Sequence, residues 1–401
     1  MGTAFAKRDV IKSSIIALLF VYASNCYNLL GWNNIVTRKY NILISSFILL
    51  LTLDNYSNIR FCFTSFHKYV FFVLFWPLFS IILGCDGSIP NEILSVYSWV
   101  PYILLFYLFY IYNVYEKHII LGMTVACVMG CIIQIFQQFY PETSIFGVID
   151  PDSDEYYGKV ASMRSGYYRF RIGILSLALF LACYYWNKLL NSKSIIICIY
   201  LALVLTYIYF SLTRQVILST IFVFIYSFTL YRDRSTKRKS VIIIFLLLSA
   251  IYFYWDELFS SLTNDYLDDK YSTDIRKECV NYYLSYMYTN PLTLIWGKGH
   301  MSLTEVSARL HGFYVSDIGF LGQAFYFGIL WAIVYIVFVI IIFKKYRKKI
   351  PVYIFLYFLS TFITSIMIFP YRNKLEMLVW VCTLYISDIY INDRVGLQEH
   401  D

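Results

Sequence analysis

Most of the residue types that could do chemistry gather in one stretch of the chain, from Arg276 to Gly322. The stretch contains Arg276, Asn290-Pro291-Leu292, Gly297-Lys298-Gly299, His311-Gly312 and Asp317-Ile318-Gly319-Phe320-Leu321-Gly322. Arginine binds anions, histidine exchanges protons near neutral pH, and paired glycines permit a tight turn or a close approach of the backbone. The remaining sequence is largely apolar, so the rest of the chain must position this stretch.

Two ionisable residues near the end of the stretch are candidates for proton transfer. His311 is expected at the C-terminal end of a short helix over 303–310, where a positive imidazolium is favoured. Asp317 follows at the mouth of an apolar run, where a carboxylate is costly unless it is paired or faces water. Each has a structural alternative. His311 is then a surface histidine that caps the short helix, and Asp317 caps the helix that starts at Ile318.

Arginines supply the candidate anion site. Arg214 interrupts the apolar tract 194–231, which is too long for one membrane span, and its guanidinium can bind a phosphate through two hydrogen bonds. The alternative is an arginine that extends its charged end to the membrane surface. The same positive field is extended by Arg276, Arg164, Arg169 and Arg171.

The composition indicates a polytopic membrane protein. Of the 401 residues, 59% are hydrophobic and only 14% are charged, compared with about 25% charged residues in a typical soluble domain. The net charge is +8, but the basic residues cluster between apolar runs, where they set membrane orientation. This distribution argues against nucleic-acid binding. No cysteine pair or acidic loop has the spacing of a metal site, so we predict neither a metal nor a cofactor.

About twelve apolar runs are long enough, or nearly so, to be transmembrane helices. They cover approximately 13–30, 40–53, 69–84, 93–112, 119–138, 172–187, 194–210, 215–231, 240–255, 318–343, 351–369 and 375–391. The predicted fold class is therefore all-α, with a single integral membrane domain over 1–401.

Two basic clusters predict the orientation of these helices. They are Arg232, Arg234, Lys237, Arg238 and Lys239, and Lys344, Lys345, Arg347, Lys348 and Lys349. Both should be cytoplasmic, because basic loops are retained on that side. The loop 256–317, between spans nine and ten, then lies outside, as does the loop 140–171. Both termini are expected in the cytoplasm.

The large outer loop is expected to be partly helical. Asp274 is the predicted cap of a helix that ends before Pro291 and lies on the membrane surface. One face of this helix carries Ile275, Cys279, Tyr282, Tyr283 and Tyr286. Gly297 and Gly299 favour a tight turn over a ligand contact. In the next span, Gly319, Gly322 and Gly328 form a small-residue face for close packing.

These motifs, in this order, resemble the bacterial O-antigen polymerase and O-antigen ligase family. The resemblance covers mainly 160–325. It consists of an arginine-bearing outer loop, Thr213-Arg214 at a span break, and a long loop with an arginine, Asn-Pro, Gly-x-Gly, a histidine and Gly-x-x-Gly.

The resemblance implies a metal-independent membrane glycosyltransferase of the bacterial inner (plasma) membrane. Its substrate would be a polyprenyl-diphosphate-linked glycan, and repeat units would be polymerised into O-antigen or exopolysaccharide at the outer face. Arg214 and Arg276 would bind the diphosphate, and His311 would serve the acceptor hydroxyl, with Asp317 as the other candidate base. A chain-length regulator and a flippase are the expected partners.

Two other functions stay open from the sequence. A ligase would transfer the glycan to the lipid A core, but ligases often have His-Asn where this chain has His311-Gly312. The run from Ser316 to Gly319 is more similar to polymerases. A transporter, such as the flippase for the same lipid-linked units, also has about twelve spans. Transporters bind near the membrane midplane and often contain repeats, whereas this chain has no detectable repeat and its polar residues concentrate outside.

Overall fold

The computed structural model describes residues 2–24, 34–55, 65–84, 99–140, 161–164, 167–170, 174–192, 194–211, 213–231, 233–253, 266–289, 291–299, 313, 315–365 and 374–392. These residues form two compact units. The first is built from Met1–Leu43, Tyr112–Asn264 and Val352–Ser360, and the second from Ile44–Ile111, Asp265–Pro351 and Thr361–Asp401. We expected one integral membrane domain. The two units are described separately below.

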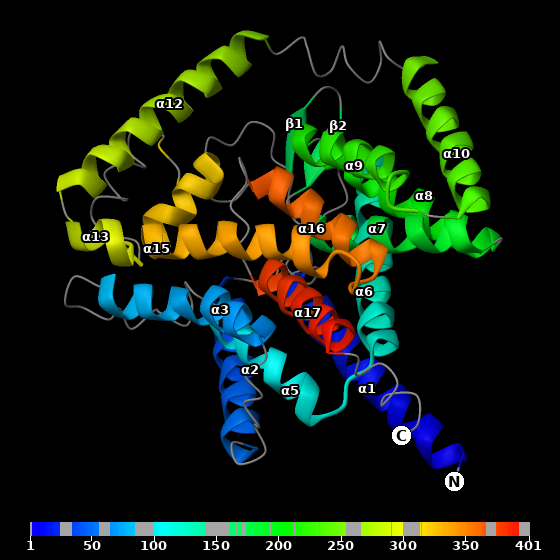
Figure 1. The fold of residues 1–401 in the computed structure, drawn as a ribbon, viewed down its shortest axis with the longest axis horizontal. Helices are drawn as coiled ribbons and strands as arrows, with labels where there is room; N and C mark the ends of the chain where they lie inside the picture. Colours follow the sequence, from blue (N-terminus) through cyan, green and yellow to red (C-terminus); the bar gives the residue numbers. More distant parts are fainter. Residues whose placement is uncertain are drawn as a thin grey trace. The chain divides into compact units, whose positions relative to one another are not determined.

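The first unit contains α1 (Gly2–Ala23), α6 (Glu116–Phe139), β1 (Ala161–Arg164), β2 (Tyr167–Phe170), α7 (Leu175–Asn191), α8 (Ile195–Phe210), α9 (Arg214–Ser227) and α10 (Arg234–Phe253). The second contains α3 (Ser65–Gly84), the 3-10 turn η3 (Val100–Leu104), α5 (Leu105–Ile111), α12 (Tyr266–Thr289), α13 (Pro291–Trp296), the 3-10 turn η5 (Val315–Ile318), α15 (Gly319–Ile341), the π turn η6 (Ile342–Tyr346) and α17 (Lys374–Ile391). α2 (Asn34–Asp54) and α16 (Val352–Ser365) contribute to both. Figure 1 shows these elements coloured along the chain.

The protein is predominantly helical, and every predicted apolar run overlaps a described helix. The exception to the all-α prediction is the antiparallel pair β1–β2, which lies in the predicted outer loop 140–171. Among the described residues, three stretches are long and apolar enough to cross a membrane, namely Phe66–Leu83, Glu116–Phe136 and Gly319–Tyr346. Several apolar helices are shorter. The chain thus has membrane-capable helices, and the count of twelve spans stays a prediction.

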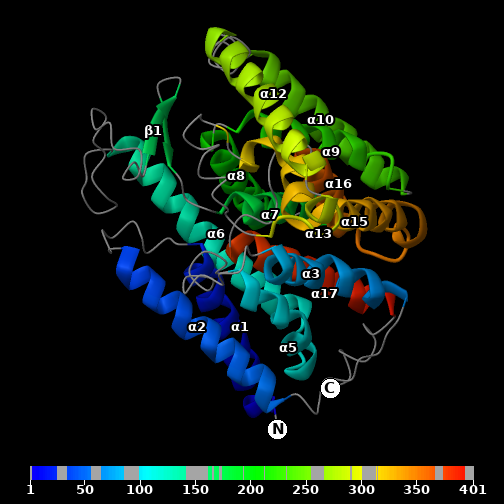
Figure 2. The same cartoon turned by 90° about the vertical axis from the view of Figure 1, so that its left-hand side faces the viewer.

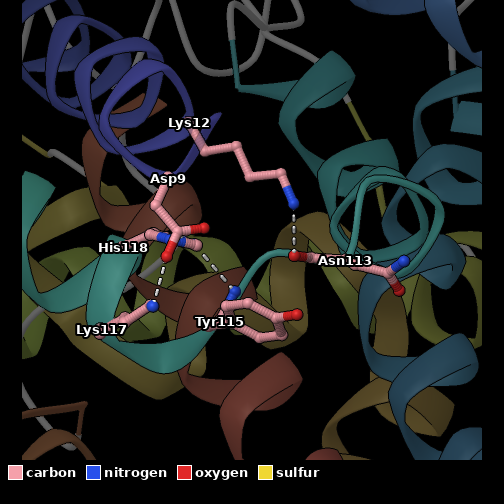
Figure 3. A network of polar contacts seen from close by, with 6 residues as sticks. All are labelled: Asp9, Lys12, Asn113, Tyr115, Lys117 and His118. Carbon is pink, nitrogen blue, oxygen red and sulfur yellow. Dashed lines mark hydrogen bonds and ion pairs between the residues drawn. The ribbon is translucent and has the colours of Figure 1, made fainter. Parts of the chain in front are cut away.

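In the first unit, polar contacts tie the start of α1 to the start of α6 (Figure 3). The Nζ atom of Lys117 lies 2.5 Å from a carboxylate oxygen of Asp9, and Lys12 donates to the carbonyl of Asn113 at 3.1 Å. The hydrogen bond from Lys117 holds the pKa of Asp9 below its usual value. His118 Nε2 is 3.4 Å from the same carboxylate. Because Gly122, further along α6, also packs against Ile16, further along α1, the two helices run in the same direction.

Helix directions elsewhere in the first unit also follow the order that alternate membrane crossings require. α7 runs opposite to α6, since Thr124 bonds to Tyr185 at 2.7 Å while Gly130, further along α6, packs against Ile174 at the start of α7. Gln134 near the end of α6 donates to the carbonyl of Phe210 at the end of α8, at 3.3 Å, so these helices are parallel. The packing is therefore compatible with the predicted alternation.

In the second unit, α3 and α15 lie side by side and antiparallel (Figures 1 and 2). Trp331 donates to the carbonyl of Val73 at 3.4 Å, and Phe66 contacts Phe338 with ring centroids 6.1 Å apart. α17 packs against α3, η3 and α5. This arrangement brings the inner ends predicted for α3 and α17 together.

Those two ends are joined by a buried acidic side chain. Asp388 in the last turn of α17 is fully buried and lies 2.7 Å from Nε2 of His67. Tyr110 and Asn392 also donate to its carboxylate. His67 belongs to the first turn of α3. The buried Asp388 carboxyl thus has three polar partners around it, as a buried polar group requires.

α15 is broken at Gly328, which has φ 84° and ψ 165°. Phe320 and Tyr335 are fifteen positions apart, which is about 22 Å in a continuous helix, yet their ring centroids are 5.9 Å apart. The outer segment 319–327 therefore folds back against the rest of α15, and Figure 1 shows the two pieces running in different directions. The sequence predicted one continuous span over 318–343 with Gly328 on its packing face. Gly328 instead interrupts the helix, because only glycine adopts this backbone conformation readily.

The substitution Gly328→Ala distinguishes a broken helix from a continuous one. In a continuous helix, alanine would stabilise by about 1 kcal/mol. In the structure, an added Cβ would lie 2.1 Å from the carbonyl oxygen of Ile295, and the backbone strain alone costs about 1–3 kcal/mol. We therefore expect the variant to unfold at a lower temperature in detergent, as followed by circular dichroism. A higher unfolding temperature would contradict the break.

Candidate functional site

The described part of the Arg276–Gly322 stretch packs as one body within the second unit. Its core is a group of side chains that we call the α12 cluster: Cys279, Tyr283, Met287, Val315, Ile318 and Phe325. These residues come from α12, η5 and the outer segment of α15. The cluster fixes the elements that carry the predicted site residues.

The start of α12 differs from the predicted start, whereas its end agrees with the prediction. It starts at Tyr266, eight positions before the predicted cap Asp274, so that residue lies inside the helix. It ends at Thr289, as expected from the proline at position 291. The predicted apolar face is confirmed, since Cys279 and Tyr283 are buried in the α12 cluster. This face is covered by other parts of the same unit.

Residues 297–299 are wedged between α3 and α15. The backbone amides of Lys298 and Gly299 donate to the carbonyls of Phe325 and Tyr326 at 2.9 and 2.8 Å. A Cβ on Gly299 would lie 1.9 Å from the carbonyl oxygen of Ser80. The glycines thus allow the backbone of residues 297–299 to approach the backbones of α3 and α15 closely. The sequence had favoured a tight turn at these glycines.

Residues 298 and 299 also supply hydrogen bonds to carbonyls that are exposed where α15 breaks. Three carbonyls near Gly328 would lack partners at the break, and a buried carbonyl without a partner is costly. Two of them accept the amides of residues 298 and 299, and the third, Phe327 O, accepts the indole of Trp76 at 2.7 Å and the hydroxyl of Ser80 at 3.2 Å. The break is consequently a fixed structural feature.

Lys298 adds a basic side chain to this region. From the sequence, it was considered only as the middle residue of the Gly-x-Gly motif. Its side chain is 4% exposed, and its Nζ atom lies 5.4 Å from the ring centroid of Tyr286 on α12. A lysine over an aromatic face gains electrostatic stabilisation. Lys374, at the start of α17, is also buried in this unit. The sequence could not show that these two lysines are buried, because burial depends on the tertiary structure.

Arg276 and Asp317 are placed on neighbouring elements. Arg276 is half-buried on α12, one turn before Cys279, and Asp317 belongs to η5, which packs against α12. The predicted capping role of Asp317 is wrong, because α15 starts at Gly319 and its N-cap residue is Ile318. The side chain of Asp317 and all of His311 lie outside the described residues, as does the predicted short helix over 303–310.

The other predicted arginines belong to the first unit. Arg214 is the first residue of α9, which confirms the predicted break between α8 and α9. Arg164 ends β1 opposite Tyr167, and Arg169 pairs with Ser162 across the hairpin. β2 packs against α6 and α8. The structure describes the backbones but not the side chains of these three arginines, and Arg171 lies outside the described residues.

Two further polar groups were missed by the sequence analysis. Asp388 sits within the predicted span 375–391, where an ionisable residue is a signal that could have been used. Gln323 of α15 is fully buried, and its amide has no hydrogen-bond partner among the described residues. In that part of the chain, no three His, Cys, Asp or Glu side chains are grouped closely enough to hold a metal ion.

Comparisons with known proteins return no relative. The chain matches no protein-family model, no curated protein and no solved structure. The likeness to the O-antigen polymerase and ligase family therefore rests on the order of motifs in the sequence.

The orientation of α12 can be tested by cysteine labelling. Tyr288 on α12 is 76% exposed, and Lys348 in the basic cluster after η6 is also exposed. In spheroplasts, we expect a membrane-impermeant maleimide to label Tyr288→Cys above the wild-type background. Lys348→Cys should be labelled only after permeabilisation. The reverse pattern would place α12 in the cytoplasm and contradict the predicted topology.

Proposed function

We propose that this protein polymerises polyprenyl-diphosphate-linked oligosaccharide repeat units at the outer face of the bacterial inner membrane. The observation that carries the proposal is the packing of α12, with Arg276, against η5, with Asp317, and against the broken end of α15. This packing holds a candidate anion-binding residue and a candidate base on neighbouring rigid elements. Such an arrangement supports a site for group transfer.

The proposed reaction needs a base and positive charge but no metal. The base, His311 or Asp317, removes the proton from the acceptor hydroxyl as its oxygen attacks the anomeric carbon. The bond from that carbon to the diphosphate oxygen breaks, and the diphosphate leaves with its electron pair. Arg276 is proposed to stabilise this departing charge. One direct displacement inverts the anomeric configuration, which linkage analysis of the product tests.

The buried cation Lys298 and the half-buried Arg276 support an anionic substrate in this unit. Arg276 lies on α12, and the Nζ atom of Lys298 lies 5.4 Å from the ring centroid of Tyr286 on the same helix. A diphosphate is the anion that the proposed reaction supplies.

A transporter is the alternative from another class, and the break in α15 is the observation that favours it. Transporters often bind their substrate or coupling ion at the unwound backbone of a broken helix. Here the carbonyls of Phe325, Tyr326 and Phe327 already accept hydrogen bonds from the protein. These three carbonyls are therefore not available to bind an ion. For this reason we favour a glycosyltransferase over a transporter.

Substitution of Arg276 tests the proposed site. Arg276→Ala should lower the elongation rate about 10²–10³-fold, as loss of one group that stabilises developing charge does elsewhere. Lys277→Ala is the matched control, because the Lys277 side chain is 71% exposed on the same helix. His311→Ala should lower the rate about 10²–10⁴-fold.

The measurement is surface glycan length on a gel, in a deletion strain that expresses each variant at the wild-type level. We expect single repeat units on an intact core for Arg276→Ala and His311→Ala, and a full ladder for Lys277→Ala. A bare core with long lipid-linked chains would instead identify a ligase. Full ladders from all three variants would refute the site.

A further inference from the structure

The fully buried amide of Gln323 is a polar group that the fold does not explain. Neither its oxygen nor its nitrogen has a hydrogen-bond partner among the described residues. A glutamine amide offers two donors and an acceptor, and burying them unpaired costs free energy. Such a group in a native structure is commonly completed by a water, an ion or a ligand.

The helical face that carries Gln323 follows from its spacing. Phe320, Gln323 and Phe327 stand at positions i, i+3 and i+7 of the outer segment of α15, so they share one side. Phe325 points away from them, because its ring contacts Tyr283 of α12 at 4.5 Å between centroids. Gln323 therefore faces away from α12.

Two aromatic residues, Phe320 and Phe327, flank Gln323 on this face. Phe320 and Phe327 both contact Trp331 of the second piece of α15, with ring centroids 6.3 and 5.1 Å apart. Trp331 stacks on Tyr335 at 5.0 Å, with an angle of 18° between the rings. We call Phe320, Phe327, Trp331 and Tyr335 the aromatic face. The fold-back at Gly328 creates it, since a straight helix would hold Phe320 far from Tyr335.

We propose that Gln323 and the aromatic face bind a sugar ring of the glycan substrate. Ligand sites combine aromatic walls with a few polar groups that fix orientation. A pyranose matches this combination, because its C–H faces are apolar and its hydroxyls both donate and accept. The Gln323 amide would bond two of these hydroxyls while a ring packs on the sugar. The choice of a sugar rests on the proposed function.

The aromatic face is continuous with the surface of the unit at one end. Phe320 is half-buried, whereas Phe327 and Trp331 are buried. Side-chain rotation at a binding surface is common when a partner binds. Rotation of the Phe320 ring gives the sugar access to the amide. Phe320 also lies three positions after Asp317, so a sugar bound here is near the proposed site along the chain.

The substitution Gln323→Leu separates a ligand role from a structural one. Leucine keeps the volume and removes the unpaired amide, so the unfolding temperature should stay the same or rise. The value of kcat/KM for lipid-linked repeat units should fall roughly 5- to 100-fold, the size expected for loss of two hydrogen bonds to substrate. Gln323→Asn, which keeps the amide, should recover part of this loss.

Gln134 provides the matched control. It is equally buried in α6, but its Nε2 donates to the carbonyl of Phe210, so only its Oε1 has no hydrogen-bond partner among the described residues. Gln134→Leu should therefore lower the unfolding temperature and leave kcat/KM of the folded protein unchanged. An unchanged kcat/KM in Gln323→Leu would overturn the inference and leave the amide to a buried water.

A binding measurement keeps the two proposals distinguishable. Wild type and Gln323→Leu are reconstituted in vesicles and titrated with the lipid-linked repeat unit and with polyprenyl diphosphate, which lacks the sugar. Weaker binding of the repeat unit alone by Gln323→Leu is expected. Equal binding by both proteins refutes the sugar site. If the wild type binds the repeat unit in this way but never extends it, the polymerase proposal fails and the sugar site stands.

Discussion

The packing of the second unit depends on the hydrogen bonds that the backbone carbonyls of α15 accept where this helix breaks. A helix interrupted in an apolar environment exposes carbonyls that water cannot reach, so the protein itself must supply donors. Here the donors are the amides of Lys298 and Gly299 and the side chains of Trp76 and Ser80. The requirement joins three separate parts of the chain, and it explains why the Gly-Lys-Gly segment lies against α3. The positions of α13 and α12 follow from that contact.

Charged groups are handled differently in the two units. In the first unit, the Asp9 and Lys117 side chains pair at a partly exposed site, where an ion pair contributes modestly. In the second, Asp388 is fully enclosed and depends on the donors around it. Removing one partner from such an enclosed group is costly, since a buried polar atom is then left without a hydrogen bond. The contact between α3 and α17 is therefore more sensitive to substitution than the contact between α1 and α6.

The sequence predicted the helices well because apolar runs and basic clusters are local signals. It located the end of α12, the turn before Arg214 and the face that carries Tyr283. It failed where distant segments decide the conformation. Gly328 has the same local setting as a packing glycine, and its break is seen only in the tertiary structure, where Phe320 lies against Tyr335. Gln323 and Lys298 were likewise not identified from the sequence, because their burial depends on the tertiary packing.

The order of the partners along the chain has a consequence for biogenesis. Trp76, Ser80, Lys298 and Gly299 all precede Gly328 in the sequence. Every group that satisfies the broken helix is therefore synthesised before α15 leaves the ribosome. α15 can fold back as it enters the membrane, without first forming a straight hydrophobic helix that must later be bent. A rearrangement that placed α3 after α15 would remove this advantage and leave the break unsatisfied during insertion.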